Sequence, residues 1–281
     1  MSFARATLVE AFRLSTRFRR VVLDVPDLDA LNPPDVADAA VGVYFPAAGT
    51  RHAGHPAEVD DAEGRNYSLR EVDAGARRLT VDVVLHAHGP GTDWARRAEP
   101  GDSVVLGHAR SWYRPEPSAD WHLLVADLAG LPALARIIDE SPSRTELLAI
   151  TEVLDEGELD YLPTRAGVTV VPLVGTGNGA APSRLAAAVA ELAMPQGRGY
   201  CWFAGEAAET RTVRKHLRAA GWTRDQIDAV GYWRADSEDW DRRFAAVGSD
   251  LVDVYTRAIA EGRGEKAASE EYDEALERAG L

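Results

Sequence analysis

The stretch GRNYSLREVD, from Gly64 to Asp73, places two arginines, a tyrosine and a serine within six residues. Its apolar residues do not recur with the helical period of about 3.6, so we expect an extended strand. Alternate residues of a strand share a face, which puts Arg65 and Tyr67 on the same side of a sheet. Guanidinium and phenol groups on one face suit a ligand that is both anionic and aromatic. Taken alone, the stretch is also typical of an exposed edge strand with solvated arginines.

Short segments with strand character surround this stretch on both sides. They are rich in β-branched or aromatic residues, are bounded by Pro or Gly, and read RRVVLDV, AVGVYFP, LTVDVVLH and GDSVVLGHA. Closely spaced strands of this kind predict a small antiparallel barrel. One short helix, PGTDWARRAE, is expected between the last two strands.

The pattern changes after the proline-rich segment RPEPSAD, residues 114–120. Strands now alternate with helices, and the strands read WHLLVAD, TELLAITEV, VTVVPLV, YCWFAGE and QIDAVGYW. This alternation predicts a parallel sheet with helices on its faces and a ligand crevice at the carboxyl ends of the strands. The acidic C-terminal tail is helical in pattern. We therefore expect an α+β chain of two domains: an antiparallel β-barrel over residues 1–117, and an α/β parallel-sheet domain with a helical tail over residues 118–281.

Composition limits the classes of partner. The 281 residues carry a net charge of −14, which argues against binding to nucleic acid or to an anionic membrane surface. Cys201 is the one cysteine, so neither an intrachain disulfide nor a thiolate-held cluster is expected. No run of about 20 apolar residues and no apolar leader segment is present, which predicts a cytoplasmic protein. The oligomeric state stays open.

Several motifs, in the same order along the chain, resemble those of the siderophore-interacting proteins. RNYSLR is similar to the R-x-Y-[ST]-x-R flavin motif of that family, and the other similar segments are VVLHAHGPGTDWARRAEPGD, LLVADLAGLPALARII, WFAGEAAETRTVRKHLR, GYWR and YDEALERAGL. A barrel followed by a nucleotide-binding parallel sheet is also the order of the ferredoxin–NADP reductase superfamily. The resemblance implies an NAD(P)H-dependent reductase that passes electrons through FAD to ferric iron in a siderophore and releases Fe(II).

The resemblance also assigns flavin contacts to individual residues. Arg65 would contact the FAD pyrophosphate, Tyr67 would lie against the isoalloxazine ring, and Ser68 would position N5, the atom that accepts the hydride. The further FAD contacts it implies are Arg70, His86, Arg110 and Ser111.

The nicotinamide dinucleotide is expected at the second domain. Gly205 follows a strand and permits close approach of the backbone, and the helix that begins after it offers its N-terminus to an anion. The implied NAD(P)H contacts are Asp127, Gly205, Glu206 and Arg211. Arg211 and its neighbours could bind a 2′-phosphate or form a solvated helix face, and the sequence leaves both open. The loop GTGNG, residues 175–179, lacks the spacing of a dinucleotide fingerprint and is expected to be flexible.

Two segments depart from the family pattern. HARSW, residues 108–112, replaces a glycine-rich turn, and DLAGLPA, residues 127–133, lacks the acidic residue that the family usually carries near Leu128. These departures put the pyrophosphate and nicotinamide contacts in question. They leave two alternatives open: another flavin reductase of the same fold, and a degenerate siderophore-binding protein without catalysis.

Other side chains near these motifs have simpler interpretations. Arg234 is the expected contact for an anionic siderophore, whereas Trp233 beside it is expected to pack on the core. Trp94 is expected to pack its short helix. Neither of the histidine pairs His52/His55 and His86/His88 has a third metal ligand next to it in the sequence, so no metal site is predicted at either pair.

Overall fold

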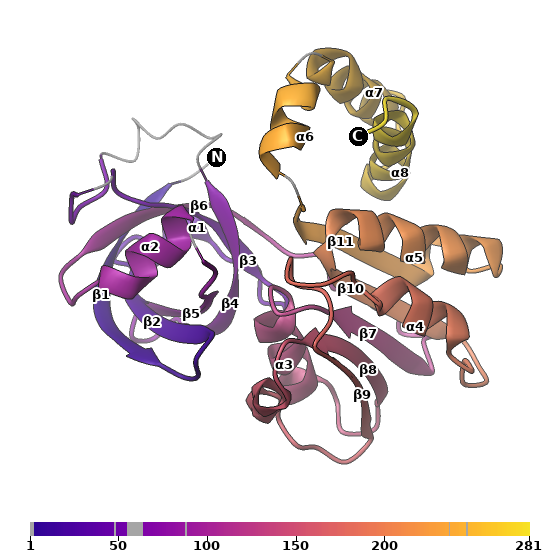
Figure 1. The fold of residues 1–281 in the computed structure, drawn as a ribbon, viewed down its shortest axis with the longest axis horizontal. Coiled ribbons are helices and arrows are strands. Elements are labelled where there is room, and N and C mark those ends of the chain that lie inside the picture. Colours follow the sequence, from indigo (N-terminus) through magenta and orange to yellow (C-terminus); the bar gives the residue numbers. More distant parts are fainter. Residues whose placement is uncertain (1–2, 48, 55–63, 88, 236, 246) are drawn as a thin grey trace.

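The computed structural model describes residues 3–47, 49–54, 64–87, 89–235, 237–245 and 247–281. Its first half is a closed antiparallel barrel with the strand order β1-β2-β5-β4-β3-β6 (Figure 1). The strands are β1 (Ala4–Arg13), β2 (Phe18–Asp24), β3 (Ala40–Tyr44), β4 (Arg65–Asp73), β5 (Arg78–Val84) and β6 (Ser103–Arg110). Two short helices, α1 (Leu28–Leu31) and α2 (Pro90–Arg97), complete this part. The stretch that opened the sequence is therefore a barrel strand, β4.

The second half is a parallel sheet with the strand order β11-β10-β7-β8-β9. The strands are β7 (Trp121–Ala126), β8 (Glu146–Val153), β9 (Val168–Val174), β10 (Gly199–Glu206) and β11 (Ile227–Trp233). One face packs on α3 (Leu131–Glu140), and the other packs on α4 (Leu185–Glu191) and α5 (Ala207–Ala219). All six side chains of β7 are buried, as expected for a strand covered on both faces. The predicted barrel and parallel sheet are both confirmed.

The chain passes from barrel to sheet between Arg110, where β6 ends, and Trp121, where β7 begins. Asp38, which is fully buried before β3, fixes this crossing. Its carboxylate accepts hydrogen bonds from the backbone N–H of Trp112 (2.9 Å) and of Tyr113 (2.7 Å), and from Nε1 of Trp202 in β10 (3.0 Å). One carboxylate thus links the barrel, the crossing segment and the sheet.

Further contacts close the interface between barrel and sheet. Asp82 of β5 accepts a two-pronged bond from Arg20 (2.7 Å to each oxygen) and also a bond from the Tyr161 hydroxyl. Tyr161 ends the 3₁₀ helix η3 (Glu156–Tyr161) of the second domain. The Tyr161 bond therefore joins the second domain to β5, and the Arg20 pair holds the Asp82 carboxylate in place for it.

The C-terminal tail forms three helices, α6 (Ser237–Phe244), α7 (Gly248–Ala260) and α8 (Glu265–Arg278), which lie over β11 and α5 (Figure 1). They have a small apolar core of their own, built on Leu251, Ala275, Leu276 and Leu281. Within the described ranges, no helix combines the length and the apolar character needed to cross a membrane.

Candidate active site

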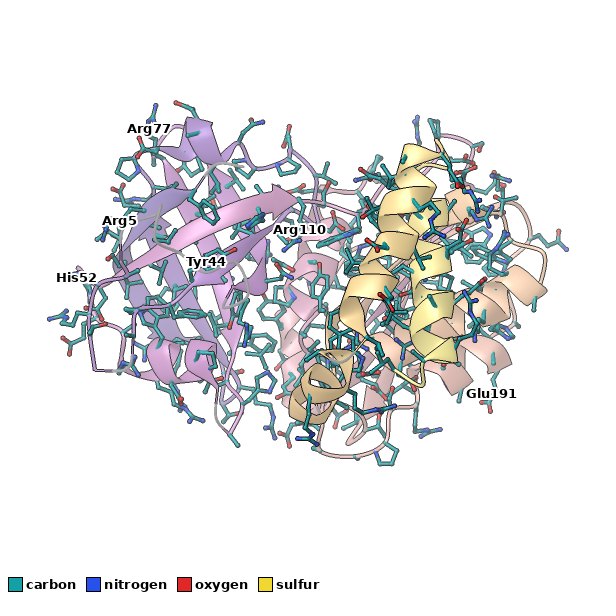
Figure 2. All side chains as sticks on the ribbon, turned by 90° about the horizontal axis from the view of Figure 1, so that it is seen from above. Arg5, Tyr44, His52, Arg77, Arg110 and Glu191 are labelled. Atoms are coloured by element: carbon teal, nitrogen blue, oxygen red, sulfur yellow. The ribbon has the colours of Figure 1, made fainter. Side chains whose placement is uncertain are left out.

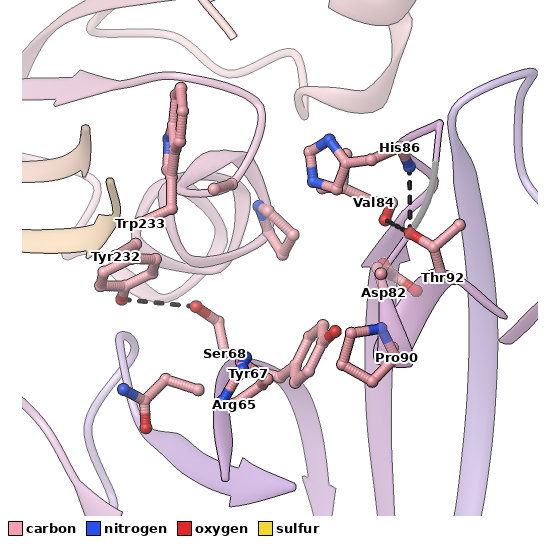
Figure 3. A pocket seen from close by; sticks show the side chains of 15 residues that line it. Arg65, Tyr67, Ser68, Asp82, Val84, His86, Pro90, Thr92, Tyr232 and Trp233 are labelled. Carbon is pink, nitrogen blue, oxygen red and sulfur yellow. Dashed lines mark hydrogen bonds between the residues drawn. The ribbon is translucent and has the colours of Figure 1, made fainter. Parts of the chain in front are cut away.

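A cavity opens where the barrel meets the carboxyl ends of β7 and β11 (Figure 3). Barrel side chains from β4, β5 and the start of α2 form one wall, and residues after β7 and at the end of β11 form the other. The sequence predicted a ligand crevice at this edge of the sheet. The polar and aromatic side chains that line the cavity include Arg65, Tyr67, Ser68, His86, Tyr232 and Trp233.

Tyr67 forms a flat wall of the cavity on the barrel side. Its ring packs edge-to-face on Phe45, with ring centroids 5.9 Å apart, and against the barrel core. Gly91 in the first turn of α2 makes room for the phenol, because a Cβ there would lie 1.9 Å from the Tyr67 oxygen. Burial raises the pKa of Tyr67 to about 12, so the phenol is neutral at physiological pH. The wall is therefore fixed in place and carries no charge that would repel an anionic ligand.

Ser68 is buried beside Tyr67 and faces the second domain. Its hydroxyl donates to the Tyr232 hydroxyl at 3.4 Å, and both residues line the cavity. Tyr232 is a site residue that sequence reasoning missed, because its hydroxyl pairs with a serine 164 residues away in the chain. The pairing shows that this floor of the cavity exists only when the two domains are docked.

Trp233 lines the cavity from the second domain, which corrects the expectation that it packs on the core. Its Nε1 donates to Asp127 Oδ2 at 2.5 Å, and the same carboxylate accepts from the backbone N–H of Ala129 at 2.8 Å. A Cβ on Gly205 would lie 2.9 Å from that oxygen, so the glycine is needed for Asp127. Burial raises the pKa of Asp127 to about 6. Asp127 and Gly205 were both predicted to contact the dinucleotide. In the structure Asp127 accepts a hydrogen bond from the Trp233 indole, and Gly205 leaves room for the Asp127 carboxylate.

The N-terminus of α5, predicted to face a ligand anion, is capped from within the chain. The Glu206 carboxylate accepts from the backbone N–H of Ala208 (2.6 Å) and of Glu209 (3.1 Å). An in-chain carboxylate thus occupies the position expected for a phosphate. Glu206 thus has a role within the chain, and its contact with NAD(P)H stays a prediction.

The loop that contains GTGNG is closed around a second carboxylate. Glu152, buried at the end of β8, accepts from the hydroxyls of Thr176 (3.0 Å) and Ser183 (2.9 Å) and from the backbone N–H of Arg184. Asn178 Oδ1 accepts from the Leu128 N–H at 2.8 Å. The loop that was expected to be flexible is therefore tied to the sheet.

Several predicted contacts lie away from this cavity. Arg70 pairs with Asp139 of α3 at 2.6 Å, so it joins the two domains instead of lining the flavin cavity. Arg211 lies 4.0 Å from Glu277 of α8, and the Arg234 guanidinium lies 4.0 Å from the Trp240 ring centre in α6. The ligand contacts expected for Arg70, Arg211 and Arg234 stay predictions beside these in-chain partners.

Arg110 and Ser111 line a second, adjoining cavity beside the crossing segment. The Arg110 guanidinium donates to the Asn66 side-chain oxygen, and Asn66 lines the first cavity. The two cavities therefore meet at this pair.

His86 stands at the edge of the first cavity. Its backbone N–H donates to the Thr92 hydroxyl at 3.1 Å, which orders the turn between β5 and α2 (Figure 3). Among the described residues, no group of three or more potential metal ligands is found; His55 and His88, named in the predictions, lie outside those residues. Trp94 is 3% exposed and packs in the barrel core, as predicted.

Comparison with known proteins finds two family matches along the chain. Residues 7–111 match the siderophore-interacting FAD-binding domain, and residues 119–236 match the siderophore-interacting protein family. The chain is 30% identical over 234 residues to the ferric vibriobactin reductase ViuB of Vibrio cholerae, covering 79% of this chain and 85% of that one. It is 25% identical to the NADPH-dependent ferric-chelate reductase of Escherichia coli, over 84% of this chain and 94% of the relative.

Solved structures support the same relationship. A siderophore utilization protein from T. fusca is 34% identical, with a TM-score of 0.71 over 83% of this chain and 93% of that chain. A ferredoxin NADP+ reductase from Neisseria gonorrhoeae, at 14% identity and a TM-score of 0.58 over 84% and 98% of the two chains, shares the fold alone.

The residues of the first cavity fit a flavin. Tyr67 and Trp233 offer aromatic surfaces from the two domains, Ser68 and Tyr232 offer hydroxyls between them, and Arg65 lines the cavity with a cation. A flat amphipathic ring with an anionic tail needs this combination of groups. The chain therefore belongs to the siderophore-interacting protein family, and its barrel is the FAD-binding domain of an oxidoreductase of that family.

Proposed function

We propose that this protein is an NAD(P)H-dependent reductase that passes electrons through FAD to ferric iron in a siderophore and releases Fe(II). The single observation that carries the proposal is the cavity between the domains, walled by Tyr67 on one side and Trp233 on the other. A ring held there lies at the carboxyl edge of a parallel sheet, where ligands of such sheets bind.

When bound, FAD supplies the redox chemistry, because a flavin accepts a hydride from a nicotinamide and passes on its electrons singly. The chain's own residues bind and orient. Tyr67 provides a neutral stacking surface, since its pKa is raised to about 12. Ser68 and Tyr232, linked at 3.4 Å, present hydroxyls to the ring edge and position it. No side chain is required to exchange a proton in the hydride step.

The acceptor is a ferric complex of hard oxygen ligands. Such donors suit Fe(III) better than Fe(II), so reduction weakens the complex and releases the metal. Arg65 is exposed and lines the cavity, so its charge serves the FAD phosphates and also attracts an anionic complex that approaches the ring. The Arg234 guanidinium packs on Trp240, which argues against the substrate contact expected for it.

The nicotinamide dinucleotide, which is the electron donor, would approach the carboxyl edge of the parallel sheet, where carboxylates lie at the ends of β8 and β10. Glu206 and Glu152 occupy backbone N–H groups at the starts of α5 and α4. We therefore propose that the nicotinamide ring reaches the cavity beside Ala129 and Pro132, while the dinucleotide phosphates bind without these helix N-termini.

Anaerobic reduction tests the proposal. Protein reconstituted with FAD should be bleached by NADH or NADPH, and addition of a ferric siderophore should restore the flavin absorbance while a trapping chelator reports Fe(II). Bleaching without iron release would indicate a flavin reductase of another kind. Absence of flavin uptake would indicate a degenerate binding protein.

The Tyr67 wall gives a matched pair of variants for the same assay. Tyr67→Ala should lose about 1 kcal/mol or more of flavin affinity through lost stacking and burial. Phe12→Ala removes an aromatic ring that is 40% exposed on the barrel, and it should bind flavin normally. Equal affinities of the two variants would make Tyr67 a purely structural residue.

A further inference from the structure

The first cavity, which we call the flavin cavity, has a carboxylate in its wall. Alternate residues of β5 point to opposite sides of the barrel wall, so Val81 and Val83 lie in the barrel core whereas Asp82 and Val84 face the cavity (Figure 3). Among the described residues that line this cavity, Asp82 is the one carboxylate, and its side chain is fully buried. The wall therefore holds a negative charge that is shielded from water.

The groups that balance Asp82 lie behind it, away from the flavin cavity. Arg20 of β2 donates to both carboxylate oxygens at 2.7 Å, and the Tyr161 hydroxyl donates to one of them. Arg20 and Tyr161 are not among the residues that line the flavin cavity, and both line a separate pocket at the domain boundary. The ion pair is therefore oriented, with its negative end toward the flavin cavity and its positive end, 27% exposed, toward the other pocket.

An oriented pair of charges acts differently on the two oxidation states of a flavin. Uptake of a hydride adds two electrons and one proton, so the ring becomes one unit more negative. A carboxylate in the wall therefore repels the reduced ring more than the oxidised ring, and a cavity with little water strengthens this repulsion. Charge close to the ring is one of the means by which a protein tunes a bound cofactor.

We propose that the Asp82–Arg20 pair sets the reduction potential of the bound FAD, with Asp82 lowering the potential and Arg20 limiting that effect. The inference rests on the proposed function in that FAD occupies the flavin cavity. A low potential suits the acceptor, because hard oxygen ligands stabilise Fe(III) over Fe(II) and a ferric siderophore therefore needs a strongly reducing donor. Both residues act through their charges and exchange no proton.

Two variants with opposite expected signs test this assignment in the full chain loaded with FAD. Asp82→Asn keeps the shape of the side chain and leaves the Arg20 charge behind the cavity, so the midpoint potential should rise. Arg20→Gln leaves the carboxylate without its cation, so the potential should fall. Each change should alter the ratio of the affinities for reduced and oxidised FAD about tenfold, which for a two-electron couple is about 30 mV. Anaerobic titration against a redox dye measures the potential.

A single pH and a matched variant isolate the effect of this pair. The other charged or titratable groups at the cavity, whose protonation one pH holds constant, are Arg65, Tyr67, His86 and Tyr232 in the wall and Asp127 behind it. Asp29→Asn removes the carboxylate from another arginine–aspartate pair of the barrel, Arg77–Asp29 at 2.7 Å. Figure 2 shows Arg77 on the barrel well away from the second domain, so this variant should keep the wild-type potential.

Removal of one hydrogen bond gives a variant that keeps both charges. Tyr161→Phe takes a donor from Asp82 and leaves the Arg20 pair, so the potential should fall by less than in Arg20→Gln. If Asp82→Asn does not fold, an unchanged or raised potential in Tyr161→Phe would contradict the inference in its place.

The double variant Asp82→Asn/Arg20→Gln completes the cycle and should return close to the wild-type potential. Shifts of the same sign in the two single variants, or no shift in either, would overturn the inference and leave FAD in the flavin cavity. A chain that binds no FAD would overturn both this inference and the proposed function.

Discussion

At the scale of the residue, Asp127 holds a carboxyl group where water does not reach. It is 1% exposed, and its partners are the Trp233 indole and two backbone N–H groups. Burial outweighs these donors and raises its pKa to about 6. The Asp127 carboxyl therefore holds the Trp233 indole in place, although the fold destabilises the charged form of this carboxyl.

This shift predicts a pH-dependent stability. Because the folded carboxyl binds its proton more tightly than the unfolded one, Asp127 stabilises the fold below pH about 4, and this contribution is lost as the pH rises through about 6. Two pKa units correspond to about 3 kcal/mol. Asp127→Asn should therefore gain about that much stability relative to wild type between pH 4 and pH 7. Urea unfolding at several pH values measures it, and Asp160→Asn on the exposed η3 helix is the control. Parallel curves for Asp127→Asn and wild type would contradict the shift.

Sequence reasoning found the residues of β4 but not all of their partners. The alternation of a strand correctly separates Tyr67, which packs on the barrel core, from Ser68, which faces the other domain. It does not show that Arg70 pairs with Asp139, which lies 69 residues away on α3, because the sequence alone does not show which acidic residue an arginine contacts. The same holds for Glu206: its type shows an acid at a helix start, and only the coordinates show that it caps that helix.

At the scale of the element, helices α5 and α8 meet through opposite charges. The basic face of α5 supplies Arg211, Arg214, Lys215 and Arg218, and the acidic face of α8 supplies Glu270, Asp273 and Glu277. The helices α7 and α8 pack their apolar residues mainly on each other. The docking of α8 on α5 therefore relies largely on ion pairs, which salt screens.

Hydrogen exchange tests this electrostatic docking. Amide exchange in α8 should speed up at high salt more than exchange in α3, which is buried against the sheet. Arg214→Ala should give part of the same effect at low salt, because its pairing with Asp273 is half-buried and worth more than an exposed pair. Arg278→Ala, an exposed arginine of the same helix α8, should not. Salt-independent exchange in α8 would show that apolar contacts hold it.

The elements themselves were largely predictable. The β-branched residues of β5 and the continuous apolar run of β7 give a clear pattern, whereas β1 turns the small Ala4 and Ala6 into the barrel and gives a weak one. The apolar spacing in PSRLAAAVAELA predicts a helix over residues 182–193, but the observed helix α4 spans only Leu185–Glu191, because Ser183 and the Arg184 N–H bind Glu152. A contact distant in sequence thus decides where α4 begins.

At the scale of the whole molecule, the two domains are coupled through Asp38. A side-chain truncation there leaves two backbone N–H groups and one indole N–H without their acceptor. Asp38→Ala should destabilise the protein by about 2–3 kcal/mol, since each unsatisfied buried donor costs about 1–3 kcal/mol and part of this cost is relieved by relaxation. Thermal unfolding measures it. Asp35→Ala, on the exposed part of the same segment, should unfold like wild type, and equal midpoints for the two variants would show that Asp38 does not couple the domains.

The carboxylates of Glu152, which binds the N–H of the residue before α4, and of Glu206, which caps α5, have a consequence for selectivity. A cell is rich in inorganic phosphate and free nucleotides, and an open helix start would collect them. Here Glu152 and Glu206 already fill those positions, so small phosphates find negative charge where they would otherwise bind. The phosphates of the nicotinamide dinucleotide must then be bound by groups other than these helix starts. The carboxyl edge of the sheet is then not blocked by inorganic phosphate or free nucleotides, and it stays accessible to the nicotinamide dinucleotide.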